Sequence, residues 1–295
     1  MALVGPTASG KSEIAMQVAE AVGAPILSID SMQVYRGLDI GTAKPTPADR
    51  QRVTHLMIDL AEPEETFTAA MFQWAAREII DSGQHEAILL VGGSGLHLRA
   101  VVDPLAFPPH DPVVRQAIVS SDDPAGDLLR LDPEAGSIVD LNNPRRVARA
   151  LEVYELTGAT PSDRLRDPST RAVREYQSMY QFRAVGLDPG EELGPRIGAR
   201  IKSMAEAGLL SEVRHLHENR RFGATTRNAV GYRQLIPVVE GNLEVDAGFQ
   251  LVRSATNALA RRQRTFFRRD PRIAWIRWRS SASDRLTEVR EAWGL

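Results

Sequence analysis

The chain contains no cysteine among its 295 residues. Disulfides, thiolate catalysis and zinc sites built on cysteine are therefore excluded, and a metal ion must be held by oxygen ligands or histidine. Long apolar runs are also missing, since no stretch approaches the roughly eighteen residues of a membrane span. The first residues, MALVGPTASGKS, lack the charged and apolar segments of a signal peptide. We therefore expect a cytoplasmic protein with no membrane contact.

The chain also lacks a large net charge. The formal net charge of -2 by itself predicts no affinity for nucleic acid. The charges are nevertheless segregated, because acids dominate 61–65 and 122–134, whereas 253–272 reads RSATNALARRQRTFFRRDPR. Hydrophobic content of 43% and charged content of 25% are ordinary for a globular protein of one large domain or two smaller ones. The local distribution of charge is therefore more informative than its sum.

Apolar runs alternate with helical patterns through the first hundred residues. The runs lie at 26–30, 56–60 and 87–91, and the helical pattern at 13–22 stops before Gly23. Near-continuous apolar strands that alternate with helices predict an α/β fold with a doubly wound parallel sheet. Later segments predict two further strands, at 180–187 and 272–278, and helices at 195–208, 209–218, 231–241 and 245–267.

The residue composition and the hydrophobic pattern change between residues 110 and 178. This segment contains acids, prolines and short helical pieces but no strand pattern, so we predict a helical insertion at 110–178 within a core domain of 1–109 and 179–295. Asn143 is expected to cap a helix that starts at Pro144 and ends at Gly158. Its apolar stripe is Val147, Leu151 and Tyr154, and its other sides offer Arg145, Arg146 and Arg149 to solvent or to a partner.

The sequence GPTASGKS fits the phosphate-loop pattern G-x-x-x-x-G-K-[ST] between a predicted strand and a predicted helix. Its residues are Gly5, Pro6, Thr7, Ala8, Ser9, Gly10, Lys11 and Ser12. Backbone N–H groups and the helix N-terminus would converge on phosphate oxygens, Lys11 would neutralise charge, and Ser12 can ligate Mg²⁺. The loop therefore predicts a phosphorylated ligand.

Two polar residues follow predicted strands at the same edge of the sheet. The run AILLV ends in GGSG with no acid, so the aspartate that a hydrolase uses to hold its metal is missing. Asp30 instead closes the strand after the phosphate loop, where it is either a general base for an incoming hydroxyl or amine or the N-cap of a helix near Ser31. Ser94 either hydrogen-bonds a substrate or satisfies a turn.

Further blocks occur in order along nearly the whole chain. They are DSMQVYRGLDIGTAKP at 30–45, THLMIDL at 54–60, GGSGLHLRA at 92–100, DPVVR at 111–115, NPRRVARALEVYELTG at 143–158, RIGAR at 196–200, GYRQ at 231–234 and RRQRTFFR at 261–268. With these blocks and the phosphate loop, the chain resembles the bacterial tRNA dimethylallyltransferases, also called tRNA isopentenyltransferases.

The resemblance implies a phosphate-loop NTPase-like core in which the loop binds dimethylallyl diphosphate, rather than ATP, with Mg²⁺. The prenyl group then goes to N6 of the adenosine just 3′ of the anticodon, in tRNAs that read codons beginning with U. Asp30 matches the family's general base, Lys11, Ser12 and Arg200 match diphosphate or magnesium contacts, and Ser94 matches a threonine near the target adenosine. A monomer that binds the tRNA anticodon stem-loop is expected.

The resemblance also implies a set of tRNA-contacting positions. They are Asp30, Ser31, Met32, Gln33, Ser94, Arg115, Arg145, Arg146, Arg149, Asn228, Gly231, Tyr232, Arg233, Arg262, Gln263, Arg264, Thr265, Arg268 and Arg269. Phe266 and Phe267 are expected in the core rather than stacked on bases, from the usual burial of phenylalanine.

Three features depart from the family pattern. Ser94 replaces the commoner threonine and keeps the hydroxyl with less rigidity. His97 stands where tyrosine is frequent, and we expect it merely to pack. Only Ala2, Leu3 and Val4 are available for the first strand before Gly5, so either the edge of the fold is trimmed or the true start lies upstream.

The residues alone leave other functions open. A phosphate loop followed by an acid after the second strand is also typical of small-molecule kinases, which consume ATP. A relative that prenylates AMP or ADP to form cytokinin would need neither the insertion nor the basic C-terminal helix. A non-catalytic tRNA-binding protein would not need Lys11, Ser12 and Asp30 together.

Overall fold

One parallel sheet organises the molecule. The computed structural model describes residues 1–295, and its six strands lie in the order β3-β2-β4-β1-β5-β6 with every neighbouring pair parallel. The strands are β1 (Ala2–Val4), β2 (Ile26–Ser28), β3 (His55–Leu56), β4 (Leu89–Gly92), β5 (Ala184–Gly186) and β6 (Ile273–Trp275). The predicted α/β class with a doubly wound parallel sheet is therefore confirmed.

Helices supply most of the remaining chain. The α-helices are α1 (Lys11–Val22), α2 (Pro47–Arg52), α3 (Ala69–Asp81), α4 (Gly95–Val102), α5 (Pro112–Val119), α6 (Pro124–Leu131), α7 (Pro144–Thr157), α8 (Pro161–Arg166), α9 (Pro168–Arg174), α10 (Leu193–Glu206), α11 (Leu209–Glu218), α12 (Tyr232–Val239), α13 (Val245–Phe267) and α14 (Ala282–Trp293). Short 3₁₀ turns are η1 (Ala135–Ser137), η2 (Gly190–Glu192) and η3 (Thr226–Asn228). None of the helices is both long and apolar enough to cross a membrane.

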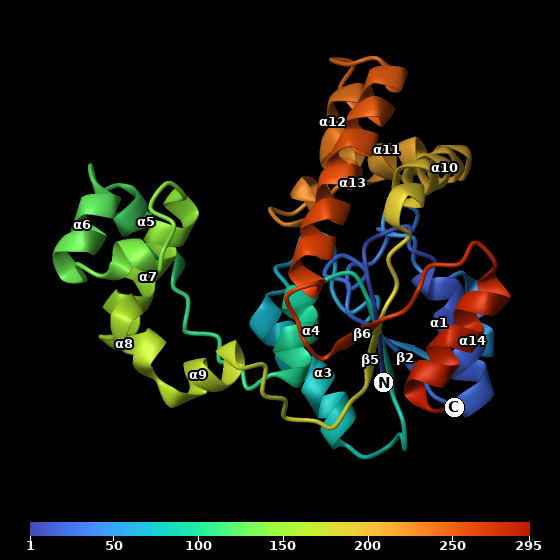
Figure 1. Ribbon diagram of the computed structural model, residues 1–295. Helices are drawn as coiled ribbons and strands as arrows, with labels where there is room; N and C mark the ends of the chain where they lie inside the picture. Colours follow the sequence, from blue (N-terminus) through green and yellow to red (C-terminus); the bar gives the residue numbers. More distant parts are fainter. The chain divides into compact units, whose positions relative to one another are not determined.

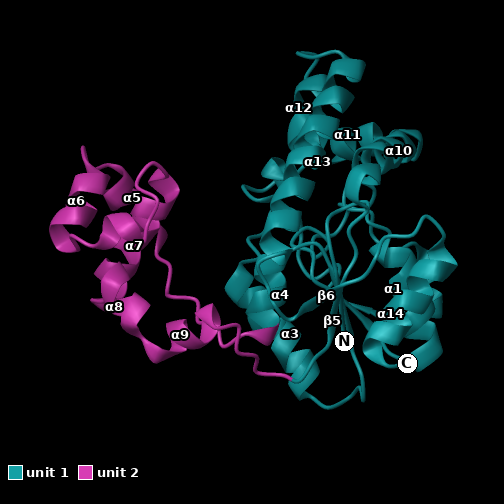
Figure 2. Cartoon of the chain, viewed as in Figure 1, with its two compact units in different colours: residues 1–101, 181–295 teal, residues 102–180 magenta.

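Two compact units divide the chain (Figure 2). The first comprises residues 1–101 and 181–295 and contains the whole sheet, and the second comprises 102–180 and is helical. The segment predicted as an insertion, 110–178, lies inside the second unit.

Helices cover both faces of the sheet in the first unit. Figure 1 shows α1 with α14 on one face and α3 with α4 on the other. Leu3, Leu89 and Val185 of three adjacent strands are fully buried in a core that also contains Ile14 of α1 and Trp293 of α14. The strand β1 is short, as expected, but it is central, so its three residues are all buried. The phosphate loop therefore starts from the middle of the sheet.

The sequence predicted the helix ends more accurately than the strand ends. Asn143 caps α7 by accepting from the Arg146 N–H, and Gly158 ends that helix in the left-handed region, as predicted. The strand predicted at 56–60 is wrong beyond Leu56, because Met57 and Asp59 adopt positive φ values and break the extended backbone. The last strand likewise ends at Trp275 rather than at residue 278.

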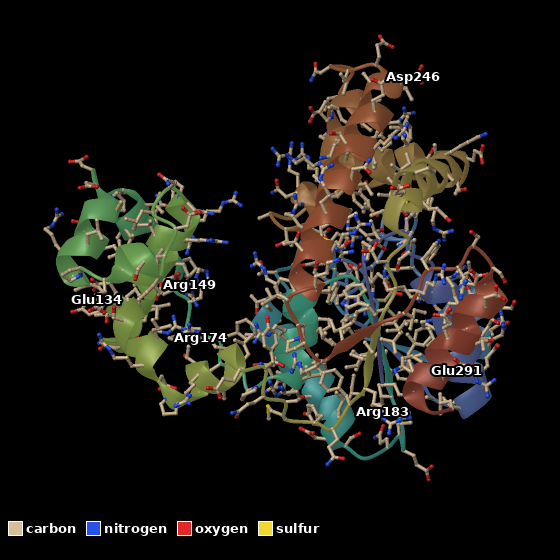
Figure 3. The ribbon with its side chains drawn as sticks, in the orientation of Figure 1. Glu134, Arg149, Arg174, Arg183, Asp246 and Glu291 are labelled. Atoms are coloured by element: carbon tan, nitrogen blue, oxygen red, sulfur yellow. The ribbon has the colours of Figure 1, made fainter.

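The second unit contains a fully buried carboxylate. Besides an apolar core of Leu128, Ala135, Val147 and Leu151, this unit buries Glu152 of α7 completely. Glu152 accepts from the Arg115 guanidinium, from the Arg149 guanidinium, from the Asp111 N–H and from the His110 ring. Arg149, labelled in Figure 3, also donates to the carbonyl oxygens of Pro108 and Pro109. A charge buried in this way is tolerated because each oxygen is hydrogen-bonded.

These partners determine the acidity of Glu152. Burial alone would raise the pKa of its carboxyl, but the hydrogen bonds from Arg149, Asp111, His110 and Arg115 outweigh burial and lower the pKa to about 2. Because the folded-state pKa lies below the unfolded value, the carboxylate stabilises the fold above the unfolded pKa. That contribution is lost as the pH falls through about 2.

We predict that Glu152→Gln lowers the local unfolding free energy of the second unit by about 3 kcal/mol, because two guanidinium groups lose their buried partner. Hydrogen exchange of the α7 amides in the full chain measures this loss. Glu155→Gln is the matched control, since Glu155 is an exposed glutamate on the same helix. Equal protection in the two variants would contradict a stabilising role of Glu152.

Candidate active site

The phosphate loop connects β1 to α1 with a backbone that requires glycine at its first position. Gly5 has a φ of +147°, and a Cβ there would lie 2.2 Å from the Leu187 carbonyl oxygen. Ala8 and Gly10 also adopt positive φ, and Gly10 is the residue that precedes α1. The Ala8 carbonyl accepts from Nε of Arg196 on α10 at 2.8 Å. The loop is thus held in an anion-binding shape by a neighbouring helix.

Lys11 is the buried cation of this loop. Its Nζ donates to the Pro6 carbonyl at 2.7 Å and to Ser9 Oγ at 3.2 Å. Burial, assisted by the charge of Arg200, lowers the pKa of Lys11 to about 7, while the charge of Asp30 acts in the opposite direction. An anionic ligand beside Lys11 would favour its protonated form, because it would compensate for the lost hydration.

Two adjoining cavities meet at the carboxyl ends of the strands. The phosphate-loop cavity, of about 520 Å³, is lined by residues 7–13 together with Arg196 and Arg200. The outer cavity, of about 430 Å³, is lined by Ser31, Met32, Ser94, Asn228, Ala229, Val230, Gly231, Arg262 and Phe266, among others. Both cavities share Thr7, Asp30, Thr42, Gly93, Arg200 and Gln263. The shared residues form the boundary at which two ligands would meet.

Asp30 stands at this boundary with one oxygen uncommitted. Its Oδ1 accepts from the Met32 N–H at 2.8 Å, whereas Oδ2 makes no hydrogen bond within the chain. The residues after it form turns rather than a helix, so the alternative that Asp30 caps a helix near Ser31 is wrong. Arg200 on α10 faces the same boundary, where burial lowers the pKa of Arg200 and the charge of Asp30 opposes that shift. A carboxylate between a cationic pocket and a second cavity suits proton abstraction.

Ser94 and His97 lie on the first turns of the segment after β4. Ser94 lines the outer cavity, and its hydroxyl is hydrogen-bonded to the His97 ring. His97 is 9% exposed and meets the Phe72 ring edge-on, with 4.5 Å between ring centroids. The expected packing of His97 is therefore confirmed, and the hydrogen bond to Ser94 is an addition that sequence reasoning missed.

The loop that carries Asp30 is fastened by Gln33 and Lys44. Gln33 accepts from Ser28 Oγ and donates to the carbonyl oxygens of Thr42 and Ala43. Its amide is therefore hydrogen-bonded within the loop, and the contact of Gln33 with RNA stays a prediction. Lys44, buried to 9% exposure, donates to the Tyr35 carbonyl and to the carboxylates of Asp39 and Asp59.

Glu212 of α11 holds the same loop from another side. Its carboxylate accepts from the backbone N–H groups of Asp39, Ile40 and Gly41 at 2.8–3.1 Å, and from the Tyr232 hydroxyl at 2.6 Å. Tyr232 is fully buried and packs so closely on Gly41 that a Cβ there would lie 2.5 Å from its ring. The Tyr232 side chain is therefore enclosed in the loop anchor, and an RNA contact at this position stays a prediction.

The basic helix α13 divides its residues between structure and cavity. Gln263 Oε1 accepts from the Thr7 N–H at 2.8 Å, so it braces the phosphate loop. Arg264 and Arg268 pair with the buried carboxylate of Asp188. The Arg264 side chain is 26% exposed and that of Arg268 is 62% exposed. Arg262 lines the outer cavity. Thr265, Arg269 and Arg233 of α12 are exposed.

The two phenylalanines of α13 have different environments. Phe267 is fully buried in the core, as expected, whereas Phe266 is 39% exposed and lines the outer cavity. Sequence reasoning placed both in the core, and the expectation for Phe266 is therefore corrected. Its ring offers the outer cavity an apolar wall.

The predicted RNA-contacting arginines of the second unit also differ in availability. Arg145 and Arg146 are exposed on α7. Arg115 and Arg149 instead direct their guanidinium groups to Glu152, with side-chain exposures of 28% and 33%. The expectation that all of α7's arginines are free for a partner is corrected for Arg149.

A magnesium ion would find few protein ligands here. No group of three His, Cys, Asp or Glu side chains is arranged to hold a metal. Mg²⁺ is, however, commonly bound through one or two protein oxygens together with phosphate oxygens and waters. The Ser12 hydroxyl, exposed in the phosphate-loop cavity, fits that mode.

Comparison with known proteins gives one consistent family. The sequence model of the family described as IPP transferase matches residues 33–270, a range that does not include the phosphate loop. The tRNA dimethylallyltransferase of Bifidobacterium longum is 39% identical over 290 residues, which cover 94% of this chain and 85% of the relative. The same-named enzyme of Streptomyces coelicolor is 40% identical over 286 residues, which cover 94% and 89%. The tRNA isopentenylpyrophosphate transferase of Bacillus halodurans superposes with a TM-score of 0.72 at 29% identity, covering 99% of this chain and 94% of that one.

We predict that Glu212→Gln loosens the loop next to Asp30, because a neutral amide is a weaker acceptor for three backbone N–H groups. Exchange of the Asp39, Ile40 and Gly41 amides should accelerate about tenfold, the equivalent of one charge-assisted hydrogen bond. Glu218→Gln, an exposed change on the same helix, should leave these amides protected. Unchanged exchange in Glu212→Gln would show that the carboxylate does not anchor the loop.

Proposed function

The chain belongs to the IPP transferase family, and on that premise we propose that it is a tRNA dimethylallyltransferase. It moves a dimethylallyl group from dimethylallyl diphosphate to N6 of the adenosine just 3′ of the anticodon, and releases diphosphate. We propose a monomer as the active form. An enzyme that modifies tRNA works where tRNA matures, and we place it in the cytoplasm.

The position of Asp30 carries this proposal. Its carboxylate borders both cavities, with Lys11 in one, Ser94 in the other and Arg200 in both. A diphosphate needs the cationic surroundings of the phosphate-loop cavity. The outer cavity, of about 430 Å³, is large enough for a nucleobase. The amine and the carbon that it attacks therefore meet beside a carboxylate that is able to take the proton.

The chemistry follows from these contacts. The N6 lone pair attacks C1 of the prenyl group, the C1–O bond breaks with its electron pair leaving on diphosphate, and an N6 proton passes to Asp30. Negative charge grows on the departing diphosphate, where the loop N–H groups, Lys11 and Arg200 stabilise it. When bound, Mg²⁺ would be held by Ser12 and would supply further charge neutralisation.

Asp30 is suited to its role because only one of its oxygens is committed. The Met32 N–H fixes Oδ1 and thus the orientation of the carboxylate, and Oδ2 is left to accept the proton. The base must leave its stack to reach this recessed position. Phe266 and Met32 in the wall of the outer cavity offer apolar surface to a flipped adenine.

The remaining RNA contacts are proposed from exposed cationic and polar groups. In the first unit these are Asn228, Arg233, Arg262, Thr265, Arg268 and Arg269, together with Ser31 at the cavity. In the second unit they are Arg145 and Arg146, with Arg115 in part. Arginines of this kind contact phosphates of the anticodon stem-loop and hold its orientation.

A transfer assay tests the function directly. Purified protein, Mg²⁺ and labelled dimethylallyl diphosphate are incubated with unmodified tRNA, with AMP or without an acceptor, and ATP consumption is followed in parallel. Label in tRNA alone is the expected result. Label in AMP would instead indicate a cytokinin-forming enzyme, and ATP consumption without label transfer would indicate a kinase.

We predict that Asp30→Asn lowers the transfer rate about 10²–10⁴-fold, because an amide cannot accept the N6 proton. Asparagine keeps an oxygen for the Met32 N–H, so tRNA affinity should stay within about twofold of the wild type. Single-turnover transfer and filter binding measure the two quantities. A parallel loss of affinity and rate would contradict the role of Asp30 as base.

We predict that Arg145→Ala combined with Arg146→Ala weakens tRNA binding and lowers the slope of log affinity against log salt by about 1 to 2, since fewer phosphates are neutralised. Arg149 is left intact because its loss would unpair Glu152. Arg130→Ala is the control, since the Arg130 side chain is 68% exposed and that of Arg146 is 66%. An equal effect of the control, or no change in slope, would remove this face of α7 from the interface.

A further inference from the structure

The hydrogen bond between Ser94 and His97 reaches into the outer cavity. Ser94 Oγ and His97 Nδ1 lie 2.7 Å apart. The serine lines the cavity that also contains Asp30, whereas the histidine is buried behind it. Packing of the Phe72 ring edge against His97, at 4.5 Å between centroids, fixes the imidazole in this orientation. The pair therefore has one member open to a ligand and one member locked in the protein.

The protonation of the pair determines what Ser94 offers to a ligand. Burial lowers the pKa of His97, although the charge of Asp30 opposes this, so a neutral ring is favoured at pH 7. Of the two neutral tautomers, the one with its proton on Nε2 leaves Nδ1 to accept the Ser94 O–H, and the role inferred for His97 requires this tautomer. The serine oxygen then presents only lone pairs to the cavity, as an acceptor.

An attacking exocyclic amine needs such an acceptor. The N6 group has two hydrogens and must direct its lone pair at the prenyl carbon. One hydrogen goes to Asp30, so the other requires a second acceptor on the same side of the boundary if the nitrogen is to be held in line. A serine hydroxyl free to rotate would also populate orientations that point its proton at the amine.

We propose that His97 is a positioning residue that fixes Ser94 as the hydrogen-bond acceptor for the N6 hydrogen that is not transferred. It acts through Ser94 and does not touch the substrate. Serine lacks the second Cβ substituent that restricts the side chain of threonine, and the bond to Nδ1 supplies the missing restriction. This inference rests on the proposed function, because it assigns a role in the same amine transfer.

Two substitutions at position 97 separate positioning from packing. His97→Phe keeps the ring and its contact with Phe72 but has no acceptor nitrogen. His97→Asn loses ring area but places an amide oxygen at about the position of Nδ1. Each is made in the wild type and in Ser94→Ala, and all are assayed as the full chain with labelled dimethylallyl diphosphate and unmodified tRNA. Thermal melting is recorded for every variant.

The expected pattern is opposite for activity and stability. His97→Phe should lower kcat about tenfold, the factor for one misoriented hydrogen bond, with KM for tRNA changed less than about twofold. His97→Asn should recover most of that kcat even where it melts at a lower temperature. In the Ser94→Ala background neither substitution should lower kcat further, because the oxygen that His97 orients is gone.

Three results would overturn the proposal. Equal loss of kcat in His97→Asn and His97→Phe would indicate packing alone, and a loss that multiplies with that of Ser94→Ala would show that His97 acts independently of the serine. A wild type that transfers no label to tRNA would overturn the proposed function as well. Transfer by the wild type with either of the first two patterns would overturn only the role of His97.

Discussion

The charge of Asp30 beside Lys11 and Arg200 is the interaction on which the site depends. Burial lowers the pKa of both cations, and Asp30 opposes the shift in each. Asp30 nevertheless forms no direct ion pair with either, and its single internal hydrogen bond comes from a backbone N–H. A carboxylate in a tight salt bridge would be a poor base. A carboxylate that lies near the two cations without pairing with them still stabilises their protonated forms, which a diphosphate requires.

Holding Asp30 at that distance from the cations requires a rigid loop, and the protein builds this rigidity from two charged side chains with matched partners, the buried Lys44 and the half-buried Glu212. Lys44 is enclosed by the Tyr35 carbonyl and two carboxylates, and Glu212 by three backbone N–H groups and the Tyr232 hydroxyl. Buried charges are costly unless every donor and acceptor is matched. Here the matching partners are largely backbone groups, which can be satisfied only when the loop adopts this conformation. The same contacts that offset desolvation therefore also specify the shape of the loop.

The parts of the fold that the sequence predicted are those set by local chemistry. The caps of α7, Asn143 and Gly158, act within one turn of each helix end. The phosphate loop and Asp30 were likewise predictable, because a glycine-rich turn and a strand end have local signatures. Glu212 has no such signature. It lies in an ordinary amphipathic helix, and its three backbone partners are about 170 residues away in the chain, so only tertiary structure reveals its role.

The predicted RNA contacts show why charge alone is an incomplete guide. Arginines at 145, 146 and 149 have the same chemistry and neighbouring positions, yet only Arg149 meets Glu152, one turn further along α7. An i,i+3 acid is a local signal that was available in the sequence. The sequence did not show that Glu152 is buried. An exposed ion pair at this spacing contributes little to stability, whereas the buried carboxylate holds the Arg149 guanidinium in place. His97 is the counterpart at the cavity: its packing followed from residue type, but its bond to Ser94 depends on a ring orientation that Phe72 fixes from another helix. In both cases a neighbouring residue fixes the direction of a polar side chain, Glu152 for Arg149 and Phe72 for His97. The role assigned to that side chain changes as a result.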